Sequence, residues 1–191
     1  MSKRVEVRIS GLGGQGVVLA GQILGRAAIH DGKYVVQTQS YGAEARGSAA
    51  KSEVIISDKQ IGFPKVRKCD ILVAMSQNAL DTHLRDLKEN GVLLIDESIV
   101  KEVPPVKARV LKVPATRISE RELKSKIFAN VVMLGALAKK VKAVSEKAME
   151  KGIMDSVSEE TREENIKAFR QGMTFYEQKE TQTNTQPEAY T

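Results

Sequence analysis

The sequence predicts an α/β fold, a single Rossmann-like domain with a mainly parallel sheet and a helical C-terminal part. Three observations support this prediction. Short apolar, β-branched runs alternate with stretches of helical periodicity up to about residue 113, which is the pattern of strands joined by helices. A glycine-rich turn separates the first run from the first helical stretch. Beyond that region, the apolar residues recur mainly at helical spacing.

The expected strands are short, and helices or turns follow most of them. Strands are predicted over Val5–Ser10, Tyr34–Thr38, Glu53–Ser57, Ile71–Met75, Val92–Asp96 and Arg109–Val113. Helices are predicted over Val17–His30, Asn78–Asn90 (closed by Gly91), Ile127–Val141 and Ser145–Lys151, and from Ser156 or Ser158 to Tyr176. We expect one domain over residues 1–176 and a flexible polar tail over 177–191, which has almost nothing to bury.

The first strand departs from the pattern of a fully covered parallel strand, which is continuously apolar. Val5, Val7 and Ile9 alternate with Glu6 and Arg8. Two interpretations remain open. Either one sheet face is wet or covered by another protein, or the charged residues form an ion pair at a solvated edge.

Composition excludes several classes of function. The chain has 191 residues, 41% of them hydrophobic and 28% charged, and a single cysteine. One cysteine excludes an internal disulfide, a four-cysteine zinc site and an iron–sulfur cluster held by this chain alone. No apolar run is long enough to span a membrane, and the start of the chain has no apolar signal-peptide core. A cytoplasmic location is therefore expected.

The net charge of +6 is unevenly distributed. Residues 101–150 hold 12 Lys and Arg against 5 Asp and Glu, whereas residues 151–191 hold 5 against 8. With aromatic residues at 4% and no nucleic-acid-binding motif, we expect no nucleic-acid partner. The basic region is interpreted either as a solvated face or as a docking face for an acidic partner.

The glycine turn matches G-x-G-x-x-G. Glycine permits positive φ and close backbone approach, and the following helix N-terminus attracts anions. However, Gln37–Ser40 replace the acidic residue that would close the second strand of a dinucleotide site. Two interpretations stay open, a close-packed turn without a ligand or an anion site formed by Gly11, Gly13, Gly14, Gln15 and Gly16.

A second unusual segment, Thr38–Ser48, follows the second strand. Doubly wound geometry would place it beside the glycine turn. It offers a hydroxyl, a phenol, a carboxylate and a guanidinium within a few residues. It is either a functional surface or a turn with a surface ion pair between Glu44 and Arg46.

Together, GLGGQGVVLAGQIL, TQSYGAEARGS, SEVIIS with GFPKV behind it, DILVAMS and ANVVMLGALAKKV resemble the gamma subunit of 2-oxoacid:ferredoxin oxidoreductases. The resemblance covers roughly residues 3–176. The glycine turn followed by S-Y-G-x-E-x-R-G is its most specific part. Within the family the SYG segment looks most like the 2-oxoglutarate branch. Ser48 departs from the pattern, where a second glycine is more usual.

The resemblance implies a complex that decarboxylates a 2-oxoacid on thiamine diphosphate, passes electrons through iron–sulfur clusters to ferredoxin, and forms an acyl-coenzyme A. It implies that thiamine diphosphate, Mg²⁺ and the clusters belong to partner subunits. Those partners are alpha and beta subunits, with a ferredoxin-like delta subunit in some arrangements. No membrane partner is expected.

On this basis the chain is expected to be inactive alone and to contribute no catalytic or metal-binding residue. The glycine turn and a second set of residues would form the surface that packs against the catalytic subunits: Ser40, Tyr41, Gly42, Glu44, Arg46 and Gly47. A contact of the turn with coenzyme A is a second hypothesis. His30, His83 and Cys69 are expected to be structural. The alternative function is a stand-alone NAD(P)- or flavin-dependent oxidoreductase.

Overall fold

One six-stranded sheet, in the order β2-β3-β1-β4-β5-β6, organises the molecule. The computed structural model describes residues 4–42 and 48–184, with side chains to residue 176. β1 is parallel to β4, β4 to β5, and β5 to β6, whereas β3 is antiparallel to both β1 and β2. The mainly parallel sheet is confirmed, with β3 alone reversed. The strands are β1 Arg4–Leu12, β2 Tyr34–Tyr41, β3 Ala49–Ser57, β4 Cys69–Ala74, β5 Leu87–Asp96 and β6 Arg109–Val113.

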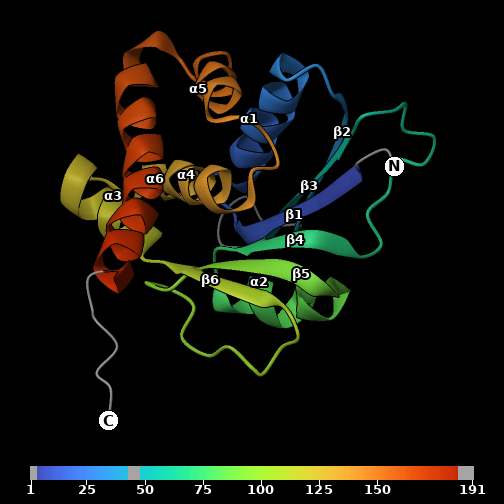
Figure 1. Cartoon of the computed structure of the whole chain (residues 1–191), viewed down its shortest axis with the longest axis horizontal. Helices are drawn as coiled ribbons and strands as arrows, with labels where there is room; N and C mark the ends of the chain where they lie inside the picture. Colours follow the sequence, from blue (N-terminus) through green and yellow to red (C-terminus); the bar gives the residue numbers. More distant parts are fainter. Residues whose placement is uncertain (1–3, 43–47, 185–191) are drawn as a thin grey trace.

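The helices cover the two faces of the sheet unequally (Figure 1). α1, α4, α5 and α6 stack over one face, and α2 lies on the other. The helices are α1 Val17–His30, α2 Gln77–His83, α3 Ala115–Leu123, α4 Ala129–Val141, α5 Glu146–Met154 and α6 Arg162–Asn184, with 3-10 turns at Leu84–Asp86, Lys126–Phe128 and Glu159–Thr161. No helix in the described ranges is long and apolar enough to cross a membrane.

Each sheet face buries its own hydrophobic cluster. Val7 and Ile9 of β1 point to the side of α1 and α4, where they join the larger cluster. Leu72 of β4 and Leu93 of β5 point to the other side, where they pack with Leu80 of α2. The alternation of side chains along a strand explains this division.

Close helix packing on the thick side depends on glycines. A Cβ on Gly135 of α4 would lie 2.0 Å from the Phe169 carbonyl oxygen, and one on Gly172 of α6 would lie 2.0 Å from the Val132 carbonyl oxygen. Gly152 of α5 meets the backbone of α1 in the same way, 2.7 Å from the Ile23 carbonyl oxygen. These three contacts bring the helix backbones closer than any side chain would allow.

Arg8, on the charged face of β1, is only 3% exposed. Its Nε donates to Glu53 Oε1 at 2.8 Å, its Nη2 donates to the Val66 carbonyl at 3.3 Å, and its Nη1 pairs with Asp86. Glu53 lies directly opposite Arg8 in the β1–β3 ladder. Of the two sequence interpretations, the ion pair is therefore correct, but it is buried and not at a solvated edge.

Burial opposes the charge on Arg8, and its acceptors more than compensate. Burial acts to lower the pKa of Arg8, but the hydrogen bonds and charges of Glu53 and Asp86 raise it above its ordinary value. Arg8 is thus a permanent cation whose donors are held by β3, by the 3-10 turn before β5 and by the loop between β3 and β4.

The predicted helix over Asn78–Asn90 is wrong in its second half. α2 ends at His83, and β5 already begins at Leu87. Leu87 is buried and pairs with Cys69 of β4, so tertiary pairing overrides the helical spacing of the leucines. Gly91 lies within β5 and does not end a helix. A Cβ there would lie 2.7 Å from the Asp70 carbonyl oxygen.

The C-terminal helices also differ from the prediction. α3 was missed because its N-terminus is capped from a distance, by Asp96 Oδ2 accepting from the Thr116 amide at 3.0 Å. Ile127, predicted as the first residue of a helix, is 65% exposed on a 3-10 turn, and α4 begins at Ala129. α6 continues to Asn184, beyond the predicted end at Tyr176, because neither Gly nor Pro occurs between residues 177 and 184.

Gly172→Ala is expected to destabilise the protein although alanine favours helix. The new methyl group would meet the Val132 carbonyl at 2.0 Å, so α6 must move away from α4. We expect the free energy of unfolding to fall by roughly 3 kcal/mol, and the midpoint of thermal unfolding by about 10 °C.

Gly62→Ala is the matched control, because nothing lies within 4 Å of a Cβ at that exposed position. Its midpoint should stay within about 2 °C of the parent. Equal midpoints for the two variants in calorimetry would contradict the tight α4–α6 crossing.

Candidate functional site

The candidate residues gather at one edge of the sheet, where the parallel strands end. β1 ends at Leu12, β2 at Tyr41, β4 at Ala74 and β5 at Asp96. We call this the carboxyl edge. Ligands of open α/β sheets usually bind at this edge. Here the edge carries the glycine turn, the start of α1 and the ends of the β2–β3 hairpin.

Gln15 fixes the glycine turn to the neighbouring strand. Its Oε1 accepts from the Leu12 amide at 2.7 Å, and its Nε2 donates to the Met75 carbonyl at 2.8 Å. Met75 follows β4, and its own amide donates to the Ser10 carbonyl of β1. Gln15 therefore links the turn to the end of β4, and both polar atoms of its side chain are hydrogen-bonded to backbone groups.

The glycines of the turn have different roles. A Cβ on Gly11 would lie 2.5 Å from Gln15 Oε1, and one on Gly16 would lie 2.4 Å from Asn130 Nδ2. These two glycines allow close packing. Gly14 has a φ of 97° and nothing within 4 Å of its Cβ position, so it faces open space. The packing interpretation thus holds for part of the turn, and Gly14 leaves room for a ligand or a partner.

Two helix N-termini meet at the turn. Asn130 Nδ2, in the first turn of α4, donates to the Gly16 carbonyl at the start of α1, at 3.1 Å. Neither helix has a side-chain cap or an acidic residue in its first turn. The amides of Gly14 and Gly16 make no hydrogen bond to the described residues. Adjacent N-termini without a carboxylate favour an anion.

Asn130 was not recognised as a site residue from the sequence. It is 1% exposed, and its Oδ1 has no hydrogen-bond partner among the described residues. An unpaired buried acceptor costs about 1–3 kcal/mol, so a group with a donor would stabilise it. In the sequence, the only feature that could have pointed to Asn130 is its position at the start of the ANVVMLG segment.

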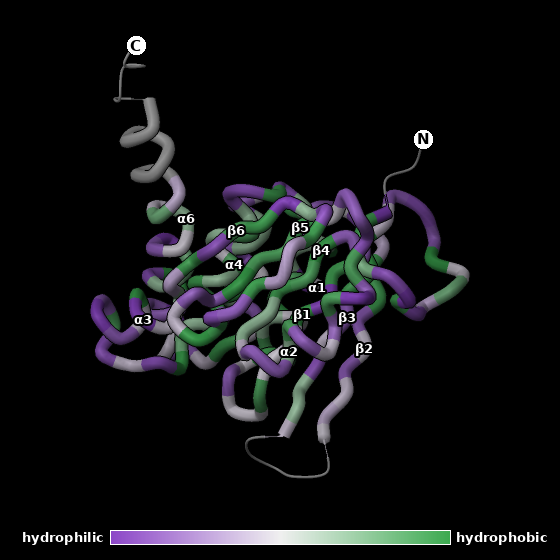
Figure 2. The backbone as a smooth tube through the Cα atoms, turned by 90° about the horizontal axis from the view of Figure 1, so that it is seen from below, coloured by the Kyte–Doolittle hydropathy of each residue, from purple (hydrophilic) through white to green (hydrophobic). Residues whose placement is uncertain are grey.

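The arm beside the turn consists of Gln39–Gly42 and Ser48–Lys51, the ends of β2 and β3 that project from the body (Figure 2). The Gly13 amide donates to the Ser48 carbonyl at 2.8 Å, which joins the arm to the turn. Ser40, Tyr41 and Gly42 are exposed, and Tyr41 is 60% so. Glu44, Arg46 and Gly47 lie outside the described residues. β3, and not β2 as doubly wound geometry would have it, lies next to β1.

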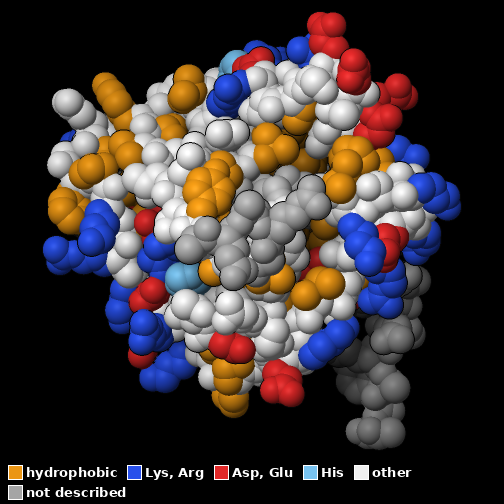
Figure 3. Space-filling model, turned by 180° about the vertical axis from the view of Figure 1, so that it is seen from behind, with side chains coloured by type: hydrophobic (Ala, Val, Ile, Leu, Met, Phe, Trp, Pro, Cys, Tyr) orange, Lys and Arg blue, Asp and Glu red, His pale blue; other side chains and the backbone are white. Residues whose placement is uncertain are grey.

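Exposed apolar side chains also belong to this edge. Ile99 follows β5 and is 39% exposed, and Ile127 precedes α4 and is 65% exposed. Figure 3 shows the back of the molecule, with hydrophobic side chains across its middle and Lys and Arg to either side. The cations of residues 101–150 are spread over a loop, β6 and three helices, and several pair with carboxylates, so they form no single docking face.

Both histidines and the cysteine lie away from the turn. His30 ends α1 and pairs with Asp155 at 2.6 Å. His83 ends α2, and burial, with the charges of Arg8 and Lys51, lowers its pKa. Burial raises the pKa of the Cys69 thiol to about 11. None of the three is placed to act at the carboxyl edge.

Three hollows of the described surface lie far from this edge. They lie at the opposite, amino edge of the sheet, around Arg4, Val5 and Ala143. At the carboxyl edge, the described ends of β2 and β3 project from the body as the arm. Such a surface suits contact with another protein better than enclosure of a small substrate.

Comparison with known proteins identifies relatives of this chain. The family model described as pyruvate ferredoxin/flavodoxin oxidoreductase matches residues 6–175. The chain is 55% identical over 172 residues to 2-oxoglutarate synthase subunit KorC of Methanocaldococcus jannaschii, covering 88% of this chain and 92% of that protein. It is 35% identical to ketoisovalerate oxidoreductase subunit VorA of Methanothermobacter marburgensis, covering 71% of this chain and 28% of that protein.

Among solved structures, the gamma subunit of a keto/oxoacid ferredoxin oxidoreductase from Geobacter sulfurreducens superposes with a TM-score of 0.79 at 45% identity. The match covers 89% of this chain and 96% of that one. The resemblance found in the sequence motifs is thereby confirmed, and nothing supports a stand-alone NAD(P) or flavin enzyme. The chain belongs to the pyruvate ferredoxin/flavodoxin oxidoreductase family, whose members include subunits of 2-oxoacid:ferredoxin oxidoreductases.

Proposed function

We propose that the chain is the gamma subunit of a cytoplasmic 2-oxoglutarate:ferredoxin oxidoreductase, which converts a 2-oxoacid to an acyl-coenzyme A and reduces ferredoxin. The chain has no catalytic residue of its own. Its carboxyl edge packs against the alpha and beta subunits, close to their cofactors. In some arrangements it also packs against a ferredoxin-like delta subunit. The 2-oxoglutarate assignment rests on the 55% identity to a 2-oxoglutarate synthase subunit.

The main support for the interface role is the structure of the carboxyl edge. A rigid turn, bridged by Gln15, lies against an exposed arm ending in Tyr41. Exposed Ile127 and Ile99 extend the same edge. Exposed aromatic and aliphatic side chains on a preorganised backbone are typical of protein interfaces.

Cofactor chemistry belongs to partner subunits in this proposal. The one cysteine is buried, and its thiol titrates far above neutral pH. Electron transfer through iron–sulfur clusters therefore needs another chain, as does thiamine diphosphate with its Mg²⁺. In VorA, the part similar to this chain is only 28% of a longer subunit.

A contact with coenzyme A is a second candidate role, favoured by the amides of Gly14 and Gly16, which have no hydrogen bond to the described residues, and by the paired N-termini of α1 and α4. A phosphate group suits these donors. A dinucleotide is not favoured. β3 separates β2 from β1, so the end of β2 is not adjacent to β1 as the ribose site requires.

Tyr41→Ala combined with Ile127→Ala should weaken assembly with the other subunits about tenfold or more, because both side chains are exposed anchors of the carboxyl edge. The fraction of this chain that copurifies with a tagged partner subunit measures the effect. Circular dichroism of the isolated chain should remain unchanged.

The matched control is Tyr34→Ala with Ile29→Ala, which removes a tyrosine and an isoleucine of similar exposure away from the carboxyl edge. It should copurify like the parent. The interface role is wrong if the Tyr41 and Ile127 variant assembles and turns over as well as this control.

Gly14→Val should raise the KM for coenzyme A of the assembled enzyme about tenfold, which corresponds to roughly 1.4 kcal/mol of binding free energy. The side chain would enter the open space in front of the turn. Gly32→Val is matched for backbone strain, since Gly32 has a φ of 70° and equally open surroundings at the other end of α1. Equal KM values for both variants would leave the turn a packing element only.

A further inference from the structure

Three hollows follow one another along the amino edge of the sheet, opposite the glycine turn. The central one measures about 490 Å³, and its neighbours about 430 Å³ and 330 Å³. The central hollow shares Val5 and Ala143 with the second and Arg4 with the third. The shared residues make these three hollows neighbours in a row, which we call the amino-edge groove.

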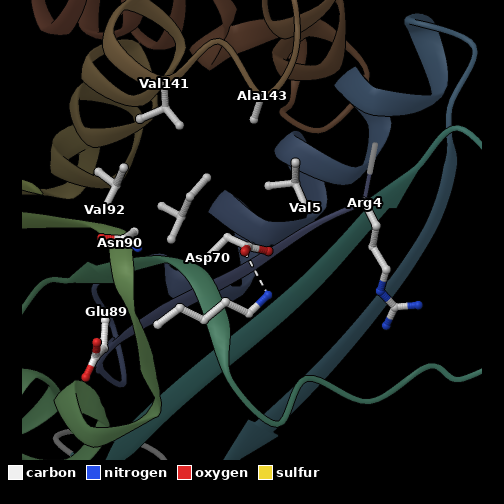
Figure 4. A pocket seen from close by; sticks show the side chains of 11 residues that line it. Arg4, Val5, Asp70, Glu89, Asn90, Val92, Val141 and Ala143 are labelled. Carbon is white, nitrogen blue, oxygen red and sulfur yellow. Dashed lines mark hydrogen bonds and ion pairs between the residues drawn. The ribbon is translucent and has the colours of Figure 1, made fainter. Parts of the chain in front are cut away.

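The middle of the groove is apolar. Figure 4 shows Val5, Val92, Val141 and Ala143 around the central hollow, with Asp70 beneath them and Arg4 extending to one side. Asp70 is already engaged, because Lys88 Nζ donates to its Oδ1 at 2.7 Å and the Glu6 amide donates to its Oδ2 at 2.8 Å. The hollow therefore offers an aliphatic side chain the apolar wall of Val5, Val92, Val141 and Ala143, while Glu89 and Asn90 line its polar side.

The end of the groove near Arg4 is cationic. Arg4, Lys65 and Arg67 line it together with Phe63 and a single carboxylate, Glu6. Arg4 pairs with Glu6 at 2.7 Å. Lys65 and Arg67 have no carboxylate partner among the described residues, and the Arg67 guanidinium stacks on the Phe63 ring at 5.3 Å. This end has an unmatched positive charge beside an aromatic ring that is 50% exposed.

The loop that presents Phe63 is held in place by the buried network. Val66 is 4% exposed, and its carbonyl accepts from Arg8 Nη2. The Phe63 carbonyl accepts from Arg4 Nη2 at 3.2 Å. The loop projects from the side of the sheet near the N-terminus (Figure 1), yet its backbone is fastened to β1 at two points. A preorganised basic and aromatic loop lowers the entropic cost of binding a partner.

We propose that the amino-edge groove binds an extended segment of another subunit of the complex, with an aliphatic side chain in the central hollow and acidic side chains against Lys65 and Arg67. A row of three neighbouring hollows favours an extended chain over a compact small molecule. The unmatched cations at one end favour an acidic sequence there. This second contact is independent of the carboxyl edge and lies on the opposite side of the sheet.

Two variants test the groove in the assembled complex. Lys65→Glu with Arg67→Glu reverses the charge at the cationic end, and Ala143→Phe fills the central and second hollows. Both variants should reduce at least fivefold the fraction of this chain that is retained on a tagged partner subunit. For the charge variant, the reduction in this fraction should be larger at 0.1 M than at 0.5 M NaCl, because salt screens the attraction. Arg26→Glu with Lys151→Glu, on exposed positions of α1 and α5, is the charge-matched control.

A labelling experiment gives an independent measure. Ala143→Cys introduces a thiol into the groove, and the natural Cys69 stays silent because it is buried with a raised pKa. Maleimide should label this thiol at least tenfold more slowly in the complex than in the isolated chain. Lys151→Cys, outside the groove, should be labelled at the same rate in both.

Two results would overturn the proposal. In the first, the charge and filling variants assemble like the control and Ala143→Cys is labelled equally fast in both states. In the second, the isolated chain forms a dimer in light scattering that Ala143→Phe dissociates, which would make a second copy of this chain the occupant. If only the Tyr41 and Ile127 variant assembles like its control, the proposed role of the carboxyl edge is wrong, but the groove proposal is not affected.

Discussion

The pairing of Arg8 with Glu53 is the interaction on which the arrangement of both edges depends. It joins β1 to β3 across the only antiparallel contact that β1 makes, and it is buried. A slip of one residue would turn Arg8 toward the hydrophobic cluster of α1 and α4, at a large cost for an unpaired buried charge. With the register fixed, Leu12 stands opposite Ala49, so the arm meets the glycine turn. Arg8 also holds the Val66 carbonyl and thereby the basic loop at the other edge.

Sequence periodicity predicted the strands and α1 well because their side chains alternate or repeat according to burial in one sheet. One example is β1, in which the apolar Val7 and Ile9 alternate with the charged Arg8. Only the structure shows that Arg8 is buried as well. The misplaced elements depend on contacts distant in sequence. Leu87 extends β5 because it pairs with Cys69, and α3 begins where Asp96 caps it. At the site, the glycines could be predicted from their motif. The roles of Gln15 and Asn130 could not, because each depends on a backbone group of another segment.

Under the proposed function, the two edges of the sheet would let a subunit that lends no catalytic residue serve a redox enzyme. The glycine turn has the form of a ligand-binding loop, but Gln15 and the packing of Gly11 and Gly16 stiffen it into a surface element, and Gly14 faces open space among the described residues. On the opposite edge, a groove with one cationic end could hold a strand of a neighbour. Contacts on both sides of one rigid sheet would fix the position of the carboxyl edge relative to the cofactors of other subunits.

Hydrogen–deuterium exchange of the isolated chain and the assembled complex would test the interface claim most directly. The account predicts that amides of Gly14–Leu19 and of Gln39–Gly42 exchange at least tenfold more slowly in the complex. Amides of α5 away from both edges, such as those of Glu150 and Lys151, should exchange equally in both states. Unchanged exchange at the turn and the arm, in a complex that is active and intact, would contradict the account.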